Sequence, residues 1–599
     1  MKSTNPTVLF SLMGLPIIYF YWFVYNHTIN VPYLDDFQIL NTVVRVQNEP
    51  LKWFTILTEN FIGHRFGEIK ILVWLDYLIE GQVNFKTLCI FGSFFLFGFW
   101  FFCLKIAREN NIAPAYLLPF TIILFQPIFH RNVFWMLSCL QYQQSIFFTL
   151  VAYYYLSKFT KQSFVISIVL GIIHTQINGN AIYIFMFGAL IPLYQGRYKM
   201  MTIYVIIGII SGMLFYWNMP TLVGLAGYTL QDLMITNPTI LLNALGGFLG
   251  GAINLSNVKT YYIAALGIGL ACSILFILLI LFLLVFKNLY KNSFIKYPKI
   301  ETKLLKLDII FKQRITMIMM AGSLLLTAVG VAISRGVFHQ TIMLVDRYYL
   351  YSVITIAVVY LLIIMFTEGK IRMVIGIISL PLSIFFSLYS YQTAISQVLF
   401  FEHSLEADIY DLRHHRTTNN KMFGFSPTSL DLFEESLRRK IYQFPKSRFD
   451  TLENLLSEPI NNQGISKLNL QFSFSKELQK VYGGVRILHI NNQGFYLSEN
   501  NSQNIFFIVL KNRQNNDSYI IYPQRSNALR SNFWSKYQIF TYGFTTMIQQ
   551  DCVKKGMYSI GLLIFENGKA NLKYTRQSID IDNTKMIDWM QTLGYFKNT

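Results

Sequence analysis

The feature that most constrains this chain is a series of long apolar runs. The runs Ala271 to Phe286, Ile315 to Val331 and Tyr348 to Phe366 each contain no charged residue. A run of about 20 predominantly apolar residues is the length that an α-helix needs to cross the hydrocarbon core of a bilayer. Charged residues make up only 14% of the chain, whereas a soluble chain carries about 25%. A bilayer is therefore the expected solvent for most of this sequence.

Hydropathy predicts about eleven membrane-spanning helices. The first apolar run follows a single lysine and lacks a small-residue cleavage site, so we expect a retained anchor rather than a signal peptide. The spans are expected near residues 8–25, 86–104, 114–129, 133–156, 163–176, 181–195, 200–218, 260–286, 315–333, 348–366 and 373–398.

Basic residues predict the orientation of these spans. Lysines and arginines gather in the gaps 105–112, 158–161, 197–199, 287–314 and 370–372, which fall on alternate loops. By the positive-inside rule these gaps are cytoplasmic, and so is the N-terminus. We therefore predict a multi-pass protein of a bacterial cytoplasmic (inner) membrane, with the chain beyond about residue 400 on the extracytoplasmic side.

The formal charge of +19 does not predict a nucleic-acid partner. Basic residues lie mainly in short gaps between apolar runs and form no arm or patch interleaved with aromatic residues. Of the five cysteines, four lie in or beside apolar spans and one stands alone in the tail, so no disulfide framework is expected. We interpret the charge as a signal of membrane topology.

The chain is expected to have two domains. Residues 1–399 form the transmembrane domain, with long outer loops at 26–85 and 219–259. Residues 400–599 are more polar and form a soluble extracytoplasmic domain, which begins with a helical segment at 430–442. A β-sandwich with helical decoration is predicted there from β-branched or alternating runs at 469–474, 485–490, 504–510, 518–522 and 557–565.

An acidic pair follows the first predicted span. Asp35 and Asp36 stand in the segment Pro32 to Phe37 at the expected outer membrane surface. Of two adjacent carboxylates in a partly dry site, one can act as a base while the other stays ionised and binds a metal or a sugar hydroxyl. A structural interpretation stays equally open, because Asp35 and Gln38 resemble a capping box that opens a helix at Phe37.

Arginines occur on the predicted outer side, where the charge rule disfavours them. Arginine pairs bidentately with phosphate, so several arginines converging from separate loops would hold a lipid phosphate at the outer interface. Taken singly, each arginine is more simply explained by a side chain that carries its charge to the interface. As a set they predict an anion site made by His64-Arg65, His130-Arg131, Arg335 and Asp346-Arg347, the last followed by Tyr348.

Other motifs have simpler structural explanations. Gln141, Gln143 and Gln144 lie in the fourth predicted span and are typical of hydrogen bonds between helices. Glycines around Gly246 and Gly250 form a small-xxx-small face, which is usually a packing device.

No standard metal or nucleotide motif is present in the sequence. His414-His415 lie near Asp408 and Asp411, but their spacing matches no common metal site and favours a solvated linker. A nucleophile elbow, a zinc motif and a dinucleotide fingerprint are all lacking.

The layout of these residues resembles the GT-C superfamily of integral membrane glycosyltransferases, which includes protein mannosyltransferases and the aminoarabinose transferase of lipid A. The resemblance covers roughly residues 1–400. It departs from the family because the two acids are adjacent, and because His130-Arg131 stands where many members have another acid. The matching motifs are Asp35 with Asp36, His64 with Arg65, Asn178 with Gly179, and Arg335 with Arg347-Tyr348.

The resemblance implies a role for each matching residue. Asp35 becomes the preferred catalytic base and Asp36 its partner. The cofactor stays unknown, and a divalent metal ion, if one is used, would be held by the same two carboxylates. The implied donor-phosphate site contains His64, Arg65, Arg335, Arg347 and Tyr348, and the implied further substrate-binding residues are Arg131 and Asn178.

We therefore predict a membrane glycosyltransferase that moves a sugar from a polyprenyl-phosphate donor to an extracytoplasmic acceptor, which is a cell-envelope glycan, a lipid or a protein. The absence of a Trp-Trp-Asp signature argues against transfer of a whole oligosaccharide to asparagine. One alternative is an O-antigen-type polymerase or ligase. Another is a transporter or flippase, for which pseudo-symmetric halves and charged groups near the bilayer midplane are expected. A third is a non-enzymatic scaffold that displays the tail.

Overall fold

A computed structural model of the chain divides into two compact units. The helical unit comprises Met1–Asn26, Arg45–Asp76 and Thr87–Ala394. The mixed unit comprises His27–Val44, Tyr77–Lys86 and Ile395–Thr599. The structure describes residues 6–59, 64–217, 238–254, 258–289, 298–335, 346–417, 427–458, 460, 470–474, 487–492, 505–515, 517–525, 543–549, 552–566 and 568–581.

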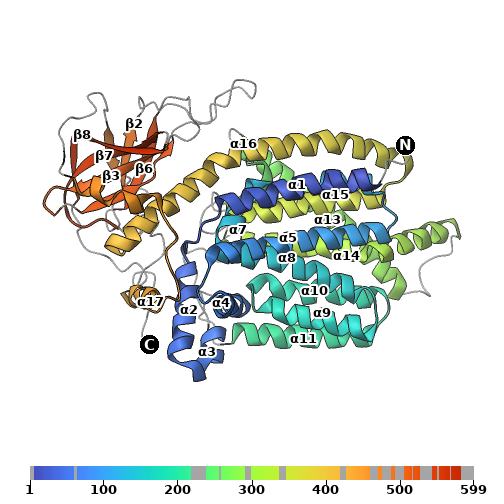
Figure 1. Cartoon of the computed structure of the whole chain (residues 1–599). Helices are drawn as coiled ribbons and strands as arrows, with labels where there is room; N and C mark the ends of the chain where they lie inside the picture. The colour runs from blue at the N-terminus through green and yellow to red at the C-terminus, as the bar shows by residue number, and fades with distance from the viewer. Residues whose placement is uncertain are drawn as a thin grey trace. The chain divides into compact units, whose positions relative to one another are not determined.

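Apolar α-helices build the helical unit, and its long helices run in nearly the same direction (Figure 1). The helix α16 (Gly369–His415) contributes its first part to this unit and its second part to the mixed unit. The other helices are α1 (Pro6–His27), α3 (Trp53–Thr58), α4 (Gly67–Glu80), α5 (Phe85–Glu109), α6 (Leu118–Leu124), α7 (Arg131–Phe134), α8 (Met136–Leu156), α9 (Lys161–Thr175), α10 (Tyr183–Tyr194), α11 (Tyr198–Tyr216), α12 (Pro238–Gly250), α13 (Thr260–Leu289), α14 (Pro298–Arg335) and α15 (Tyr349–Phe366).

Within the described part of the chain, seven helices are long and apolar enough to cross a membrane. They correspond to seven of the eleven predicted spans. The predicted spans near 114–129, 163–176 and 181–195 form shorter apolar helices, and the span near 133–156 forms α8, which three glutamines make more polar. The seven helices are Thr7–His27, Phe85–Glu109, Tyr198–Tyr216, Thr260–Phe286, Leu304–Ile333, Asp346–Phe366 and Gly369–His415.

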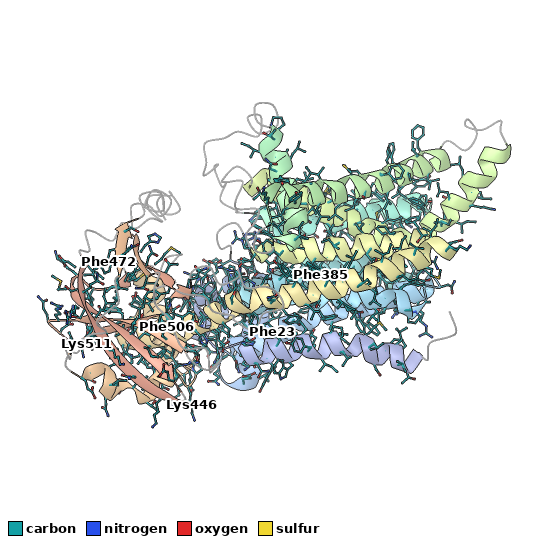
Figure 2. The ribbon with its side chains drawn as sticks, turned by 90° about the horizontal axis from the view of Figure 1, so that it is seen from above. Phe23, Phe385, Lys446, Phe472, Phe506 and Lys511 are labelled. Carbon is teal, nitrogen blue, oxygen red and sulfur yellow. The ribbon has the colours of Figure 1, made fainter. Side chains whose placement is uncertain are left out.

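The outer helices expose large apolar side chains. Phe276 on α13 is 63% exposed and Phe385 on α16 is 59% exposed. Figure 2 labels Phe385 on its helix. By contrast, nearly every residue of α15 is buried. Apolar surface of this extent is favourable in lipid and unfavourable in water. The helical unit is thus organised as a membrane-embedded bundle around α15.

The glycine face predicted around Gly246 and Gly250 packs α12 against α13. A side-chain carbon added at Gly246 would lie 2.7 Å from the carbonyl oxygen of Ala264. Carbons added at Gly250 and Gly267 would also collide with backbone atoms of the facing helix. The two helices therefore approach closely only because these positions carry no side chain.

Two antiparallel four-stranded sheets form the core of the mixed unit. Their strand orders are β1-β2-β6-β5 and β4-β3-β7-β8. The predicted β-rich region is confirmed, whereas the strands β5, β6 and β8 were missed. The strands are β1 (Gln471–Phe474), β2 (Ile487–Asn492), β3 (Ile505–Asn512), β4 (Ser518–Ile521), β5 (Gln524–Arg525), β6 (Phe544–Gln549), β7 (Gly556–Glu566) and β8 (Lys569–Ile581).

The two sheets share one apolar core, which makes them a sandwich. Ile490 and Ile548 from the first sheet join Ile508 and Leu562 from the second. The alternate residues of β3, such as Phe507, face a second apolar cluster that includes helical side chains from α16 and α18 (Glu453–Ser457). The strand β3 is therefore buried on both faces.

Segments of the predicted outer loop 26–85 belong to the mixed unit. The ring of Phe37, on α2 (Asp36–Asn48), packs 5.2 Å from that of Phe433 on α17 (Pro427–Arg438). The hydroxyl of Tyr442 donates to the carbonyl of Asn30 at 2.9 Å. Of the other predicted outer loop, 219–259, residues 219–237 and 255–257 lie outside the described residues and the part between them contains α12.

Candidate functional site

A polar network lies where α7, α8 and α15 of the helical unit begin. The short helix η3 (Pro127–Phe129) precedes α7, and η8 (Asp346–Tyr348) precedes α15. Trp135 is extended, at φ −106° and ψ 112°, so the chain breaks between α7 and α8. The helix η8 contacts both η3 and α7. This junction brings together two of the predicted sites, His130-Arg131 and Asp346-Arg347.

Asp346 joins the two sides of the junction. Its Oδ2 accepts a hydrogen bond from Nε of Arg131 at 2.7 Å and lies 3.3 Å from Nε2 of His130. The guanidinium of Arg347 lies 5.1 Å from the centre of the Tyr348 ring. Asp346 thus offsets the charge of Arg131, and Arg347 adds a second cation to the same turn.

Side-chain amides fix the backbone of this junction. Nδ2 of Asn132 donates to the carbonyl of Arg347 at 2.8 Å and to Oγ of Ser138 at 2.9 Å. Nε2 of Gln143 donates to the carbonyl of Asn132 at 2.6 Å. Arg347 is therefore held in place through its main chain, which limits where its guanidinium can reach.

Glu68 extends the network to α4. Nε2 of Gln144, on α8, donates to Oε1 of Glu68 at 2.5 Å. Burial raises the pKa of the Glu68 carboxyl to about 7, and the hydrogen bond from Gln144 opposes that rise. This residue was missed in the sequence because the contact joins positions 76 apart. The available signal was a carboxylate three residues after Arg65, at the start of a helix.

Two helices begin at this network with their amino ends uncapped by side chains. Trp135 and Tyr348 are the N-cap residues of α8 and α15, and neither side chain accepts a capping hydrogen bond. The amino end of a helix carries a partial positive charge and attracts anions. Together with Arg131 and Arg347, these helix ends make the junction suited to a phosphate.

No protein-family model, no curated protein and no solved structure matches this chain. The chemistry of the site therefore follows from its own geometry.

Arg65 binds backbone carbonyls at the ends of two helices. Its guanidinium donates to the carbonyl of Thr58, at the end of α3, with a distance of 3.0 Å. It also donates to the carbonyl of Phe215, near the end of α11, at 2.8 Å, and to the carbonyl of Trp217. A cation at the carboxyl end of a helix is stabilising because it offsets the partial negative charge there. The neighbouring His64 stacks on Phe66, with ring centres 5.1 Å apart.

Lys70 caps α3 in the same way. Its Nζ donates to the carbonyls of Glu59 at 2.7 Å and Ile56 at 3.4 Å. Burial lowers the pKa of this ammonium to about 8. Basic side chains around α4 thus have partners within the helical unit itself.

The acidic pair belongs to the mixed unit. The helix α2 begins at Asp36, one residue earlier than predicted, and the buried carboxylate of Asp36 accepts the backbone N–H of Tyr33 at 3.0 Å. Leu34 between them takes a left-handed conformation, with φ at 50°. Asp35 is half-buried. The two adjacent acids therefore have different surroundings.

The remaining predicted residues are placed as follows. Asn178 is buried and is the N-cap of η4 (Gly179–Ile182). Tyr348 is buried, and its ring packs 5.4 Å from that of Phe248 on α12. Arg335 is the last residue of α14, and its side chain lies outside the described residues.

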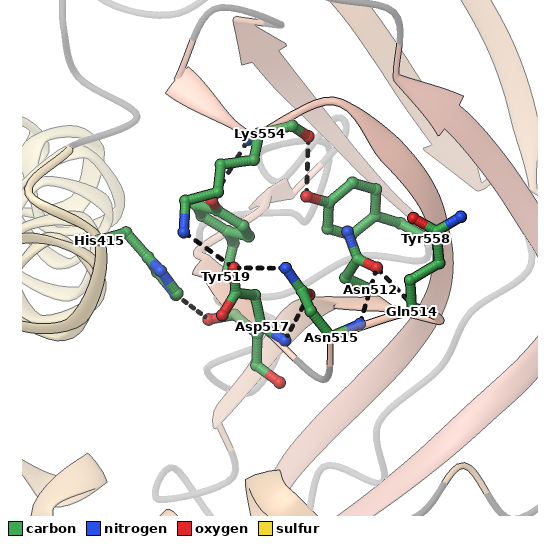
Figure 3. Close-up of polar contacts among 9 residues, drawn as sticks. His415, Asn512, Gln514, Asn515, Asp517, Tyr519, Lys554 and Tyr558 are labelled. Carbon is green, nitrogen blue, oxygen red and sulfur yellow. Dashed lines mark hydrogen bonds and ion pairs between the residues drawn. The ribbon is translucent and has the colours of Figure 1, made fainter.

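Within the described residues, no group of three or more His, Cys, Asp or Glu side chains is placed to hold a metal ion. His414 and His415 instead bond to backbone carbonyls. Nδ1 of His414 lies 2.9 Å from the carbonyl of Tyr410, and Nε2 of His415 lies 2.8 Å from that of Ser518 (Figure 3). The His415 contact attaches the end of α16 to the edge strand β4, whereas the His414 contact lies within α16.

Proposed function

We propose that this protein is a membrane glycosyltransferase that takes its sugar from a polyprenyl-phosphate donor and transfers it to an extracytoplasmic acceptor. The observation that carries the proposal is the network that joins Arg131 and Arg347 to the amino ends of α8 and α15. A phosphate attached to a membrane-buried lipid has to bind at the end of apolar helices. This junction offers such a phosphate two cations and two helix dipoles.

The reaction is a displacement at the anomeric carbon. The acceptor oxygen forms a bond to that carbon while the bond from the carbon to the phosphate oxygen breaks. A carboxylate takes the acceptor's proton, and the lipid phosphate leaves with its charge stabilised by arginine. The resemblance to GT-C enzymes assigns the proton-accepting role to Asp35, with Asp36 as its partner. A divalent metal requirement and the identity of the sugar stay open.

The proposal includes the finer topology. Three shorter helical regions and α8 join the seven long helices to give eleven spans, with the N-terminus cytoplasmic and the tail extracytoplasmic. The support is the alternation of basic gaps along the chain. A reporter fused after Thr599 is expected on the extracytoplasmic side and one inserted at 290–310 on the cytoplasmic side. A cytoplasmic tail would contradict the proposed orientation.

The function is tested by transfer from a radiolabelled polyprenyl-phosphate hexose to a cell-envelope fraction, using the purified full-length protein. Arg347→Ala is expected to lower transfer by about a hundredfold. Arg347→Lys keeps the charge but loses the planar fork, so an intermediate loss is expected. Arg197→Ala is the matched control, because Arg197 lies in a basic gap and its guanidinium contacts Phe159, donating to its carbonyl at 3.3 Å and lying 4.7 Å from the centre of its ring.

Equal activity of Arg347→Ala and the Arg197→Ala control would contradict a role for the network in donor binding. Repeated addition to one acceptor, visible as a ladder of products, would favour the polymerase alternative over single transfer.

A further inference from the structure

Four side-chain oxygens in the network accept no hydrogen bond from any residue that the structure describes. They are all shielded from solvent and come from three neighbouring elements, α4, α7 and α8. Gln143 and Gln144 are each 1% exposed, and Asn132 is fully buried. The four atoms are Oε2 of Glu68, Oδ1 of Asn132, Oε1 of Gln143 and Oε1 of Gln144.

The orientation of the three amides is fixed by their nitrogen atoms. Nε2 of Gln144 donates to Oε1 of Glu68. Nε2 of Gln143 donates to the carbonyl of Asn132, and Nδ2 of Asn132 donates to the carbonyl of Arg347. Turning any amide over would place an oxygen against an acceptor. The oxygens therefore remain directed away from these partners, and the network has unused acceptors.

Buried acceptors without a donor are unfavourable and are rare in folded proteins. A group that satisfies several of them at once must itself carry several donors. The nearest cation on α4, Lys70, donates instead to the carbonyls of Ile56 and Glu59. A phosphate supplies no such donors, whereas a sugar supplies several hydroxyl groups.

We propose that Glu68 and Gln144 form a subsite that binds the hydroxyl groups of the donor's sugar, beside the phosphate site at Arg347. This inference rests on the proposed function and adds the part of the donor that the network recognises. Asn132 connects the two subsites, because its nitrogen bonds the backbone of Arg347 and its own oxygen is one of the four unused acceptors. A hydroxyl donor at Oε2 would stabilise the ionised carboxylate and so lower the pKa that burial raises.

The variant that tests the subsite is Glu68→Gln. Because Nε2 of Gln144 needs an acceptor, the new amide is expected to keep its oxygen toward Gln144. Its NH₂ group then replaces Oε2, so an acceptor becomes a donor with little change in shape. Glu80→Gln is the matched control, because Glu80 ends the same helix, is exposed and accepts a hydrogen bond from the side chain of Asn84.

The measurement is calorimetric binding to the full-length protein of neryl phosphate and of neryl phosphate linked to glucose, galactose or mannose. Wild type is expected to bind at least one sugar-bearing probe more tightly than neryl phosphate. Glu68→Gln is expected to weaken that probe about tenfold, which is the loss of one charge-assisted hydrogen bond, and to leave neryl phosphate unchanged.

The outcomes separate this inference from the proposed function. Failure of wild type to bind either kind of probe would contradict the proposed function. Two results would overturn the subsite alone while neryl phosphate still binds tightly. In one, the sugar-bearing probes bind no more tightly than neryl phosphate; in the other, Glu68→Gln binds them as Glu80→Gln does. Ordered water would then be the donor to the four oxygens. An equal loss for both kinds of probe in Glu68→Gln would also overturn it, because a general disturbance of the junction would then explain the result.

Discussion

The two units each contain a polar cluster, and the clusters differ in how many of their polar atoms form hydrogen bonds. In the mixed unit, the turn between β3 and β4 is closed by Asn512, whose Oδ1 accepts the backbone N–H of Gln514 at 2.8 Å. Asp517 accepts from Asn515 and from Lys554, each at 3.0 Å (Figure 3). In the helical unit, Glu68 and its neighbours keep acceptors that no described residue satisfies.

On our proposal, this difference separates a structural cluster from a binding site. A fully bonded cluster lowers the free energy of the fold and needs nothing further. A buried cluster with unused acceptors is unfavourable unless a ligand or water supplies donors. Removing a group should therefore affect stability in the first cluster and ligand binding in the second.

The largest expected effect concerns the acidic pair, whose two neighbouring members differ in burial. Asp36 is buried and bonded to the backbone of Tyr33, whereas Asp35 is half-buried. Asp35→Asn should lower transfer by about a hundredfold, because asparagine cannot take the acceptor's proton. Asp36→Asn should retain most activity, since its amide oxygen still accepts the N–H of Tyr33.

The check is the transfer assay, with expression and melting temperature measured for both variants. Full activity in both variants would mean that the acidic pair has only a structural role. A loss confined to Asp36→Asn would exchange the two roles.

A smaller effect is expected from the bonded cluster. Asp517→Ala removes the acceptor shared by Asn515 and Lys554, and should destabilise the β3–β4 turn by about 1 kcal/mol. Hydrogen exchange of a peptide covering 512–519 in the full-length protein measures this loss. Asp580→Ala, at an exposed position on β8, is the control. Transfer activity should not change, and a loss of activity in Asp517→Ala would break the contrast between the clusters.

The smallest expected effect is a pH-dependent change in stability. Burial raises the pKa of the Glu68 carboxyl from its usual 4.5 to about 7. The stability that the protonated carboxyl contributes is therefore fully present below pH 4.5 and is lost as the pH rises through 7. Glu68→Gln removes this loss. The variant should melt about 2 °C above wild type at pH 8 and at nearly the same temperature at pH 4.5. A difference of the same size at both pH values would mean that ionisation of Glu68 is not its cause.

Much of the helical unit could be predicted from composition, because a long uncharged run is sufficient to indicate an apolar helix. The strand β8 was missed, since its alternation of exposed and buried positions breaks at Tyr574 and Thr575, which are both buried. The arginines at Arg131 and Arg347 were found because they stand where the charge rule disfavours them. The bond from Gln144 to Glu68 could not be found this way, because no local pattern relates positions on two separate helices.

The most direct test of the central claim is an experimental structure of the full-length protein with a neryl phosphate hexose bound. The phosphate is expected within hydrogen-bonding distance of the Arg347 guanidinium, and a sugar hydroxyl within hydrogen-bonding distance of Oε2 of Glu68. A bound analogue that contacts neither residue, with the α4–α8 network unchanged around ordered water, would contradict the account.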